Sequence, residues 1–205
     1  MGKKIAVTGG IGSGKSTALN ILRQMQYPVY SCDEIYLEIT QSATYIKEVE
    51  MLFPSCVIND RIDRKILSEI VFNDKEKREK LNALAHPLIM QTLLTRMDES
   101  PGFVFAEVPL LWEGNYQNLF DAILVVKRDK KDRIQAVIQR DTTTAEKVEG
   151  CIAAQVDYDG MDFTKICNPE KVHFIENNSS IENLENQIKS FLSSMKQRTI
   201  VKHIS

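Results

Sequence analysis

Residues 4–22 read KIAVTGGIGSGKSTALNIL, and this stretch decides the fold. Its first part, Lys4–Thr8, is a short β-prone run that is typical of a buried strand. Four glycines then fall within the six positions Gly9–Gly14. The apolar residues of Ala18–Met25 recur at helical spacing, so the order is strand, glycine loop, helix.

The glycine loop has the spacing Gly-x-x-x-x-Gly-Lys-Ser, which is that of a P-loop. Glycine has no Cβ, so successive backbone N–H groups can turn inward around a phosphate, and the helix that follows adds partial positive charge. Lys15 is expected to reach the β- and γ-phosphates, and the Ser16 hydroxyl to ligate Mg²⁺. The full spacing disfavours the alternative, a glycine-rich turn without a ligand. The predicted ATP-binding residues are Gly10, Ile11, Gly12, Ser13, Gly14, Lys15, Ser16 and Thr17.

The composition is that of an ordinary globular protein of 205 residues with a net charge of −2. This charge indicates neither a general nucleic-acid surface nor a polybasic membrane surface. The four cysteines are scattered without a CxxC pair, which disfavours disulfides and zinc and favours a reducing compartment. The first apolar run, IAV, is too short for a signal peptide or a membrane span. We therefore expect a soluble, unanchored, cytoplasmic chain.

Predicted strands alternate with predicted helices, which indicates an α/β fold with a mostly parallel sheet. The expected strands are Lys4–Thr8, Pro28–Tyr30, Phe103–Val108, Ala122–Val126 and Val172–Ile175. The expected helices are Ile35–Phe53, Asp63–Phe72, Lys75–Met97 with an interruption at His86-Pro87, Lys130–Arg140, Thr144–Gln155 and Ile181–Met195. The run FPSCVINDRID is expected to break the helical pattern, and the tail from Lys196 is expected to fray.

The remaining motifs favour a small-molecule kinase among P-loop proteins. The chain lacks the NKxD run of GTPases and an LSGGQ-like run of ABC-type ATPases. Asp33 follows the second expected strand, 18 residues after Lys15. Ligands of parallel α/β sheets lie beyond the carboxyl ends of strands, so this carboxylate can orient or deprotonate an attacking hydroxyl. The alternative role is a helix N-cap, which is common for Asp.

Several further blocks make the sequence resemble the dephospho-coenzyme A kinase family. They are the P-loop, the Asp after the second strand, IDRxxL, LNALAHPLI, PLLWE and a block that ends in IAAQ. The resemblance implies transfer of the γ-phosphoryl group of ATP to the ribose 3′-hydroxyl of dephospho-coenzyme A, the last step of coenzyme A synthesis. It also implies a fold of the nucleoside monophosphate kinase type, with a five-stranded parallel core. In this division residues 1–33, 99–127 and 159–205 form the core, 34–98 the helical substrate-binding part and 128–158 the lid.

The resemblance assigns roles to individual side chains, each with a plainer alternative. Asp33 matches the catalytic aspartate, although Ser31 stands where the family often has a second acid. Arg140 is expected to close over the phosphates from the lid, or else to be a favourable charge at a helix C-terminus. Arg64, His86 and Glu113 are expected near the acceptor, and Glu107 near Mg²⁺. The alternative for Arg64 is an exposed helix charge, and that for His86 is a buried histidine that fixes a helix break. The alternative for Glu107 is a carboxylate that faces a basic partner. Gln155 is expected to contact the nucleotide or the lid hinge.

Three departures from the family pattern keep rival functions open. Ala136 replaces an additional lid arginine, for which Arg133 or Lys131 is a candidate substitute. The runs VHFIENN and DYDGMDFTKICNPEK also differ from the usual form, which puts the adenine contacts in doubt. The rivals are a kinase of another small hydroxylated metabolite or nucleoside, and a nucleotide-binding protein without transfer activity. The expected partners are ATP and dephospho-coenzyme A, with no nucleic acid or membrane, and the chain is expected to be a monomer or a weak homo-oligomer.

Overall fold

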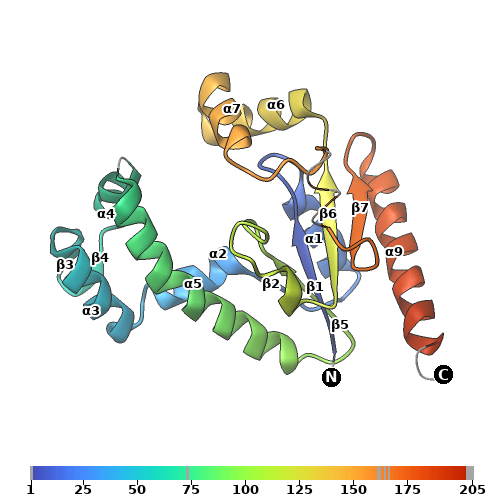
Figure 1. The fold of residues 1–205 in the computed structure, drawn as a ribbon, viewed down its shortest axis with the longest axis horizontal. Coiled ribbons are helices and arrows are strands. Elements are labelled where there is room, and N and C mark those ends of the chain that lie inside the picture. The colour runs from blue at the N-terminus through green and yellow to red at the C-terminus, as the bar shows by residue number, and fades with distance from the viewer. Residues whose placement is uncertain (1, 73, 161–162, 164, 166, 202–205) are drawn as a thin grey trace. The chain divides into compact units, whose positions relative to one another are not determined.

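The computed structural model describes residues 2–72, 74–160, 163, 165 and 167–201 (Figure 1). The chain divides into two compact units. The first unit holds residues 1–29 and 100–205, and the second holds residues 30–99. Among the described residues, no helix combines the length and the apolar character needed to cross a bilayer.

A five-stranded sheet of order β2-β5-β1-β6-β7 organises the fold, as the α/β expectation requires. Its strands are β1 (Lys3–Thr8), β2 (Val29–Ser31), β5 (Phe103–Glu107), β6 (Ala122–Lys127) and β7 (Val172–Glu176). The central strand β1 pairs in parallel with both β5 and β6, and β6 pairs in parallel with β7. Each strand lies within two residues of its predicted bounds, so the predicted strand set is confirmed.

Burial on both faces explains why the central strands are uninterrupted apolar runs. Val7 and Leu124 are buried in the cluster on one face, and Ala6 and Ile123, which alternate with them along the strands, are buried as well. Helices α1 (Lys15–Gln24) and α9 (Ile181–Val201) cover one face of the sheet with a shared apolar cluster, and Figure 1 shows α9 running beside the edge strand β7. The loop between β1 and α1 leaves the carboxyl end of β1, the central strand. This is the edge of the sheet at which parallel α/β folds bind ligands.

Two helices and a long C-terminal helix complete the first unit. Helices α6 (Lys130–Asp141) and α7 (Ala145–Ala153) follow β6 and lie beyond the end of the sheet (Figure 1). A short 3₁₀ turn spans Gln117–Leu119. The expectation of a frayed tail is wrong up to Val201, because α9 continues to that residue; residues 202–205 lie outside the described part.

The second unit is helical and has its own core. It contains α2 (Cys32–Ile39), α3 (Ala43–Leu52), α4 (Arg64–Phe72), α5 (Lys75–Asp98), a 3₁₀ turn at Pro54–Cys56 and a hairpin of β3 (Val57–Ile58) and β4 (Arg61–Ile62). Its buried cluster is Tyr45, Val49, Phe53, Cys56, Leu67, Leu81 and Ala85. The run FPSCVINDRID does break the helices, and the hairpin turns at Asn59 and Asp60, both with positive φ.

Two of the predicted helices differ from the structure. The span Ile35–Phe53 is two helices, because α2 ends at Ile39 and α3 begins at Ala43. The predicted interruption at Pro87 is absent, since α5 runs through it. Buried residues on both sides of the proline (Leu81, Ala85, Met90, Leu93 and Met97) anchor the helix, and this packing offsets the hydrogen bond that proline cannot donate.

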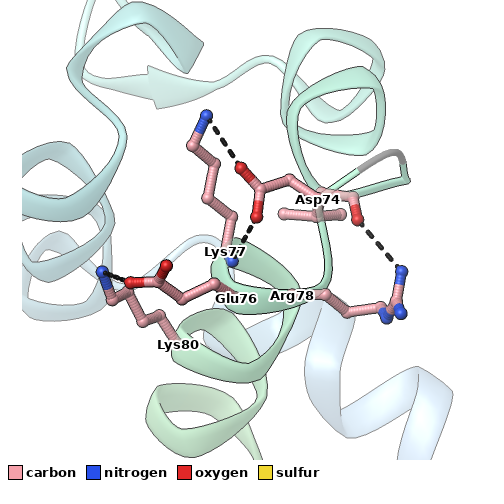
Figure 2. Close-up of polar contacts among 6 residues, drawn as sticks. Asp74, Glu76, Lys77, Arg78 and Lys80 are labelled. Atoms are coloured by element: carbon pink, nitrogen blue, oxygen red, sulfur yellow. Dashed lines mark hydrogen bonds and ion pairs between the residues drawn. The ribbon is translucent and has the colours of Figure 1, made fainter.

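The start of α5 is fixed by a capping aspartate, as Figure 2 shows. Asp74 Oδ1 accepts a hydrogen bond of 3.1 Å from the backbone N–H of Lys77, whose ammonium lies 3.3 Å from Asp74 Oδ2. The Lys77 N–H holds the pKa of Asp74 below its usual value. Lys80 and Glu76 pair one turn along, and Arg78 donates back to the carbonyl of Phe72. The cap explains why a 24-residue helix begins at Lys75.

Candidate active site

The P-loop is built from backbone conformations that glycine alone adopts without strain. Gly12 has φ +76° and Gly14 has φ +93°. A Cβ on Gly14 would also lie 2.0 Å from the Asn177 amide nitrogen. Gly14 is the N-cap of α1, so the loop passes directly into the helix whose N-terminal N–H groups favour an anion.

Lys15 and Ser16 occupy the first two positions of α1. The Lys15 ammonium donates to the carbonyl of Gly9 at 3.0 Å and to that of Gly10 at 3.3 Å, so it folds over the loop. Ser16 is exposed. The predicted phosphate cradle therefore has its cation and its hydroxyl at adjacent positions of one helix N-terminus.

Three side chains from distant parts of the first unit hold the loop from outside. Ile11 donates its N–H to Gln155 Oε1 at 2.8 Å, and its carbonyl accepts from Arg133 Nε at 2.9 Å. Asn177 Nδ2 donates to the Ser13 carbonyl at 3.0 Å. Arg133, which the sequence offers together with Lys131 as a substitute for the arginine missing at Ala136, reaches the loop backbone, and a role toward the phosphates stays a prediction for both.

Asn177 was missed as a P-loop contact. It lies within VHFIENN, which sequence reasoning treated only as a departure near the adenine. A usable signal was present, because Asn177 directly follows an apolar parallel strand and so lies at the carboxyl end of the sheet. Asn178, the next residue, exchanges two hydrogen bonds with Asp129 at the entrance to α6.

A hollow of about 680 Å³ is lined by Arg133 and Gln155, the two side chains that hold the Ile11 backbone. Its lining includes four basic side chains (Lys127, Arg128, Lys130 and Arg133) and four acidic ones (Asp129, Asp157, Asp159 and Glu176). Lys127 forms an ion pair with Asp159 and lies 5.4 Å from the centre of the Phe174 ring. Burial lowers the pKa of Arg133, while Asp159 and Asp157 act in the opposite direction. The hollow is polar but electrically balanced.

An aromatic cluster fixes the segment that follows α7. Trp112 is 8% exposed, and its ring centre lies 4.8 Å from that of Phe163 and 5.7 Å from that of Tyr158. Burial raises the pKa of Tyr158 to about 12, and its hydroxyl lies 3.4 Å from the Thr8 hydroxyl at the end of β1. The divergent run DYDGMDFTKICNPEK is thus attached to the core at Tyr158 and Phe163; positions 161, 162, 164 and 166 lie outside the described residues.

The carboxylates of Glu107, at the end of β5, and Glu113, in the turn that follows, have different surroundings. Glu107 ends β5 and is paired in register with Val7, two residues before the glycine loop. Glu113 Oε1 accepts from the Val156 N–H at 3.1 Å. The described residues contain no group of three or more His, Cys, Asp or Glu that could hold a metal. Ser16 and Glu107 carry oxygen donors of the kind that Mg²⁺ takes together with substrate phosphates, and their joint use at one Mg²⁺ stays a prediction.

Arg140 is paired within its own helix end. Its guanidinium makes two 2.7 Å hydrogen bonds to the carboxylate of Asp141, and its side chain is 62% exposed. Asp141 raises the pKa of Arg140, and the guanidinium in turn lowers that of Asp141. Arg140 also lines a second hollow, of about 500 Å³, together with Arg128 and Ala136. The predicted closure of Arg140 over phosphates stays a prediction.

In the second unit, Asp33 is the second residue of α2, directly after β2. The N-cap of α2 is Ser31, whose hydroxyl accepts from the Asp33 N–H at 3.2 Å. The capping alternative for Asp33 is therefore wrong, because its backbone rather than its carboxylate takes part in the cap. The Asp33 side chain is exposed, and an acidic residue in a first helical turn is favoured by the helix dipole.

Arg64 and His86 lie on separate helices of the second unit. Arg64 is the exposed first residue of α4. His86 is half-buried within α5, and burial lowers its pKa. The imidazole is therefore neutral at pH 7, which suits a hydrogen bond to a hydroxyl better than an ion pair with a phosphate. The alternative in which His86 fixes a helix break is wrong, because α5 is not broken there.

Two half-buried histidines, His86 and His173, make the free energy of unfolding depend on pH. Burial lowers the pKa of His86 and of His173 below the usual value of 6.5. As the pH falls through about 6.5 the unfolded chain takes up protons first, so the native state loses stability. We expect the free energy of unfolding in urea to decrease from about pH 7.5 to about pH 5.5, above the range in which most carboxylates titrate. His86→Gln and His173→Gln should each reduce this decrease; an unchanged decrease in the double variant would contradict the assignment.

Comparison with known proteins places this geometry in a family. The sequence profile of dephospho-CoA kinases matches residues 3–183. The chain belongs to the dephospho-CoA kinase family. A dephospho-CoA kinase of Fusobacterium nucleatum is 34% identical over 194 residues, which cover 91% of this chain and 95% of the relative.

Solved structures agree with this membership. One from Thermus thermophilus is 31% identical with a TM-score of 0.79, and it covers 94% of this chain and 97% of its own. A dephospho-CoA kinase from Campylobacter jejuni is 27% identical with a TM-score of 0.68, over 97% of this chain and all of its own. The family's fold therefore extends over nearly the whole chain, including the P-loop, the helical second unit and helices α6 and α7.

Proposed function

We propose that this chain transfers the γ-phosphoryl group of ATP to the ribose 3′-hydroxyl of dephospho-coenzyme A. The observation that carries the proposal is a complete P-loop, in its strand–loop–helix setting, within a chain that matches the dephospho-CoA kinase family over residues 3–183. The same site gives no reason to prefer a different hydroxylated acceptor. A protein that only binds nucleotide is disfavoured because the acceptor-side residues Asp33, Arg64 and His86 are all present.

The P-loop is proposed to bind the triphosphate. Its inward N–H groups and the N-terminus of α1 would hold the phosphates, and Lys15 would exchange its two loop carbonyls for phosphate oxygens. Ser16 and Glu107 would hold Mg²⁺, which would neutralise part of the phosphate charge. The nucleoside of ATP would occupy the hollow beside the loop, whose volume of about 680 Å³ suffices for it. Arg128 lines this hollow, and its Nε has no hydrogen-bond partner within the described residues.

Asp33 is proposed to orient the 3′-hydroxyl and accept its proton, which leaves the oxygen free to attack the γ-phosphorus. Arg64 would bind an acceptor phosphate, and neutral His86 and Glu113 would hydrogen-bond the acceptor. Arg140 would release Asp141 and pair with the transferring phosphoryl group when residues 128–158 close as a lid. Residues 34–98 would form the acceptor-binding part. We place the reaction in the cytoplasm, catalysed by a monomer or a weak homo-oligomer.

The test is ADP release from ATP and Mg²⁺, measured with and without dephospho-coenzyme A. We expect acceptor-dependent turnover and a product heavier by one phosphoryl group, with phosphorus NMR locating it on the 3′ position. Adenosine and gluconate serve as alternative acceptors. Turnover with one of these but not with dephospho-coenzyme A, or ATP binding without any acceptor-dependent turnover, would overturn the proposal.

A further inference from the structure

Both backbone polar groups of one P-loop residue are held by side chains from outside the loop. Ile11 donates its N–H to Gln155 Oε1 at 2.8 Å and accepts from Arg133 Nε at 2.9 Å through its carbonyl. Arg133 lies in the first turn of α6, and Gln155 lies just after α7. Two segments that are 22 residues apart in the sequence therefore meet on a single loop residue.

Arg133 also fits the loop closely in shape. A Cβ on Gly10 would lie 2.1 Å from Arg133 Nη2, and a Cβ on Gly12 would lie 2.4 Å from the Arg133 carbonyl oxygen. Two loop glycines are thus required by the approach of α6 as well as by the need to bring N–H groups near a phosphate. Arg133 is half-buried, and burying a guanidinium is unfavourable unless its N–H groups are paired. The Ile11 carbonyl supplies a partner for the Nε–H group of this guanidinium.

These bonds decide which loop N–H groups remain for an anion. The Ile11 N–H donates to Gln155, so it is not available to an anion while this bond is made. The opposite end of the loop is held by Asn177, which donates to the Ser13 carbonyl. A glycine-rich loop has many accessible conformations, and holding it in one shape before the ligand arrives lowers the ordering cost of binding.

We propose that Arg133 and Gln155 are positioning residues that clamp the Ile11 peptide groups and so hold the P-loop ready for a triphosphate. The clamp also ties helices α6 and α7 to the loop, so a displacement of these helices changes the loop that binds ATP. This inference rests on the proposed function only in taking ATP as the ligand. It requires no particular acceptor.

The first test measures the Kd of ATP with Mg²⁺ by titration calorimetry without any acceptor. We expect Arg133→Met to raise the Kd about tenfold, since a hydrogen bond from a charged donor is lost. Gln155→Ala should raise it about threefold, because a neutral hydrogen bond is weaker. In the double variant the increase should differ from the product of the two single increases, since both side chains hold the same loop residue.

The second test follows the Ile11 N–H directly by hydrogen exchange in the protein without nucleotide. Gln155→Ala should accelerate exchange of this N–H about tenfold or more, whereas Gln155→Glu, which keeps an acceptor oxygen, should restore most of the protection. Lys147→Met is the matched control for Arg133→Met, because it removes one positive charge from an exposed position of α7, the other helix next to the clamp. Its Kd for ATP and its Ile11 exchange should stay within twofold of the unmodified protein. Thermal unfolding of each variant checks that the fold is retained.

Two results would overturn the clamp. The first is a Kd within twofold of the unmodified protein in both Arg133→Met and Gln155→Ala. The second is full recovery of affinity in Arg133→Lys, which keeps the charge without the Nε–H donor and would assign the effect to charge alone. If Arg133→Met does not fold, the Kd of Gln155→Ala for ATP and the exchange rate of the Ile11 N–H test the clamp. A protein that passes these tests but phosphorylates no dephospho-coenzyme A would retain the clamp and lose the proposed function.

Discussion

Replacement of Lys15 by Met is expected to lower kcat/KM for ATP about 10³-fold, with the fold retained. A preorganised positive charge at the transferring phosphoryl group typically contributes two to three orders of magnitude to the rate. The Lys15 ammonium contacts the carbonyls of Gly9 and Gly10, on the loop that would hold the triphosphate. Steady-state kinetics with varied ATP and thermal unfolding measure the two parts of this expectation.

The matched control for Lys15 is Arg23→Met, which removes a cation from the last turn of the same helix. Arg23 donates to Asn20 on the helix surface, so its loss should leave kcat/KM within about twofold. A Lys15→Met protein that kept more than a tenth of the activity would contradict the assignment of Lys15 to the phosphates. A large loss in Arg23→Met would indicate that the helix, rather than its first residue, had been disturbed.

Asp33→Asn is expected to lower kcat by about 10²–10⁴-fold, the range for loss of a positioned general base. The amide keeps the size of the carboxylate but cannot accept the hydroxyl proton. The Kd of ATP should change little, because Asp33 is proposed to bind the acceptor hydroxyl rather than ATP. Single-turnover kinetics with saturating ATP and acceptor, together with an ATP titration, separate the two effects.

Glu34→Gln is the control for Asp33, since Glu34 is the next acidic residue of the same helix turn. Retention of kcat in this variant would assign the loss to the position of Asp33 rather than to the charge of the turn. The base assignment would fail if Asp33→Asn kept its rate. It would also fail if both variants lost activity equally, because charge at the start of α2 would then be the common cause.

The sheet and the P-loop were predictable because short-range patterns specify both. Buried parallel strands must be apolar on both faces, so runs such as Ala122–Val126 are visible in the sequence. The P-loop needs glycine at particular φ values, lysine and a hydroxyl at fixed spacing, and these constraints are local. Gly14 illustrates this, since its φ of +93° and its role as the cap of α1 both follow from the motif.

The predictions that failed share one cause. Contacts between residues far apart in the sequence determine those helix bounds and loop contacts. Nothing local at Pro87 shows that α5 continues, because the buried residues on its two sides act only once the second unit has formed. The division at Thr40–Ser42 likewise has no proline or glycine to mark it. The contacts of Arg133 and Asn177 with the loop join residues separated by 122 and 164 positions, which no sequence spacing reveals.

The aromatic cluster around Trp112 gives the protein an intrinsic fluorescent probe. Trp112 is the single tryptophan of the chain, so all indole emission comes from one buried site against Tyr158 and Phe163. Those two rings belong to the segment that leaves α7 and connects, through the Tyr158 hydroxyl, to the end of β1 just before the P-loop. A rearrangement that admitted water to the indole would shift its emission to longer wavelength. The unlabelled protein therefore carries an intrinsic fluorescent probe of the packing next to the end of β1.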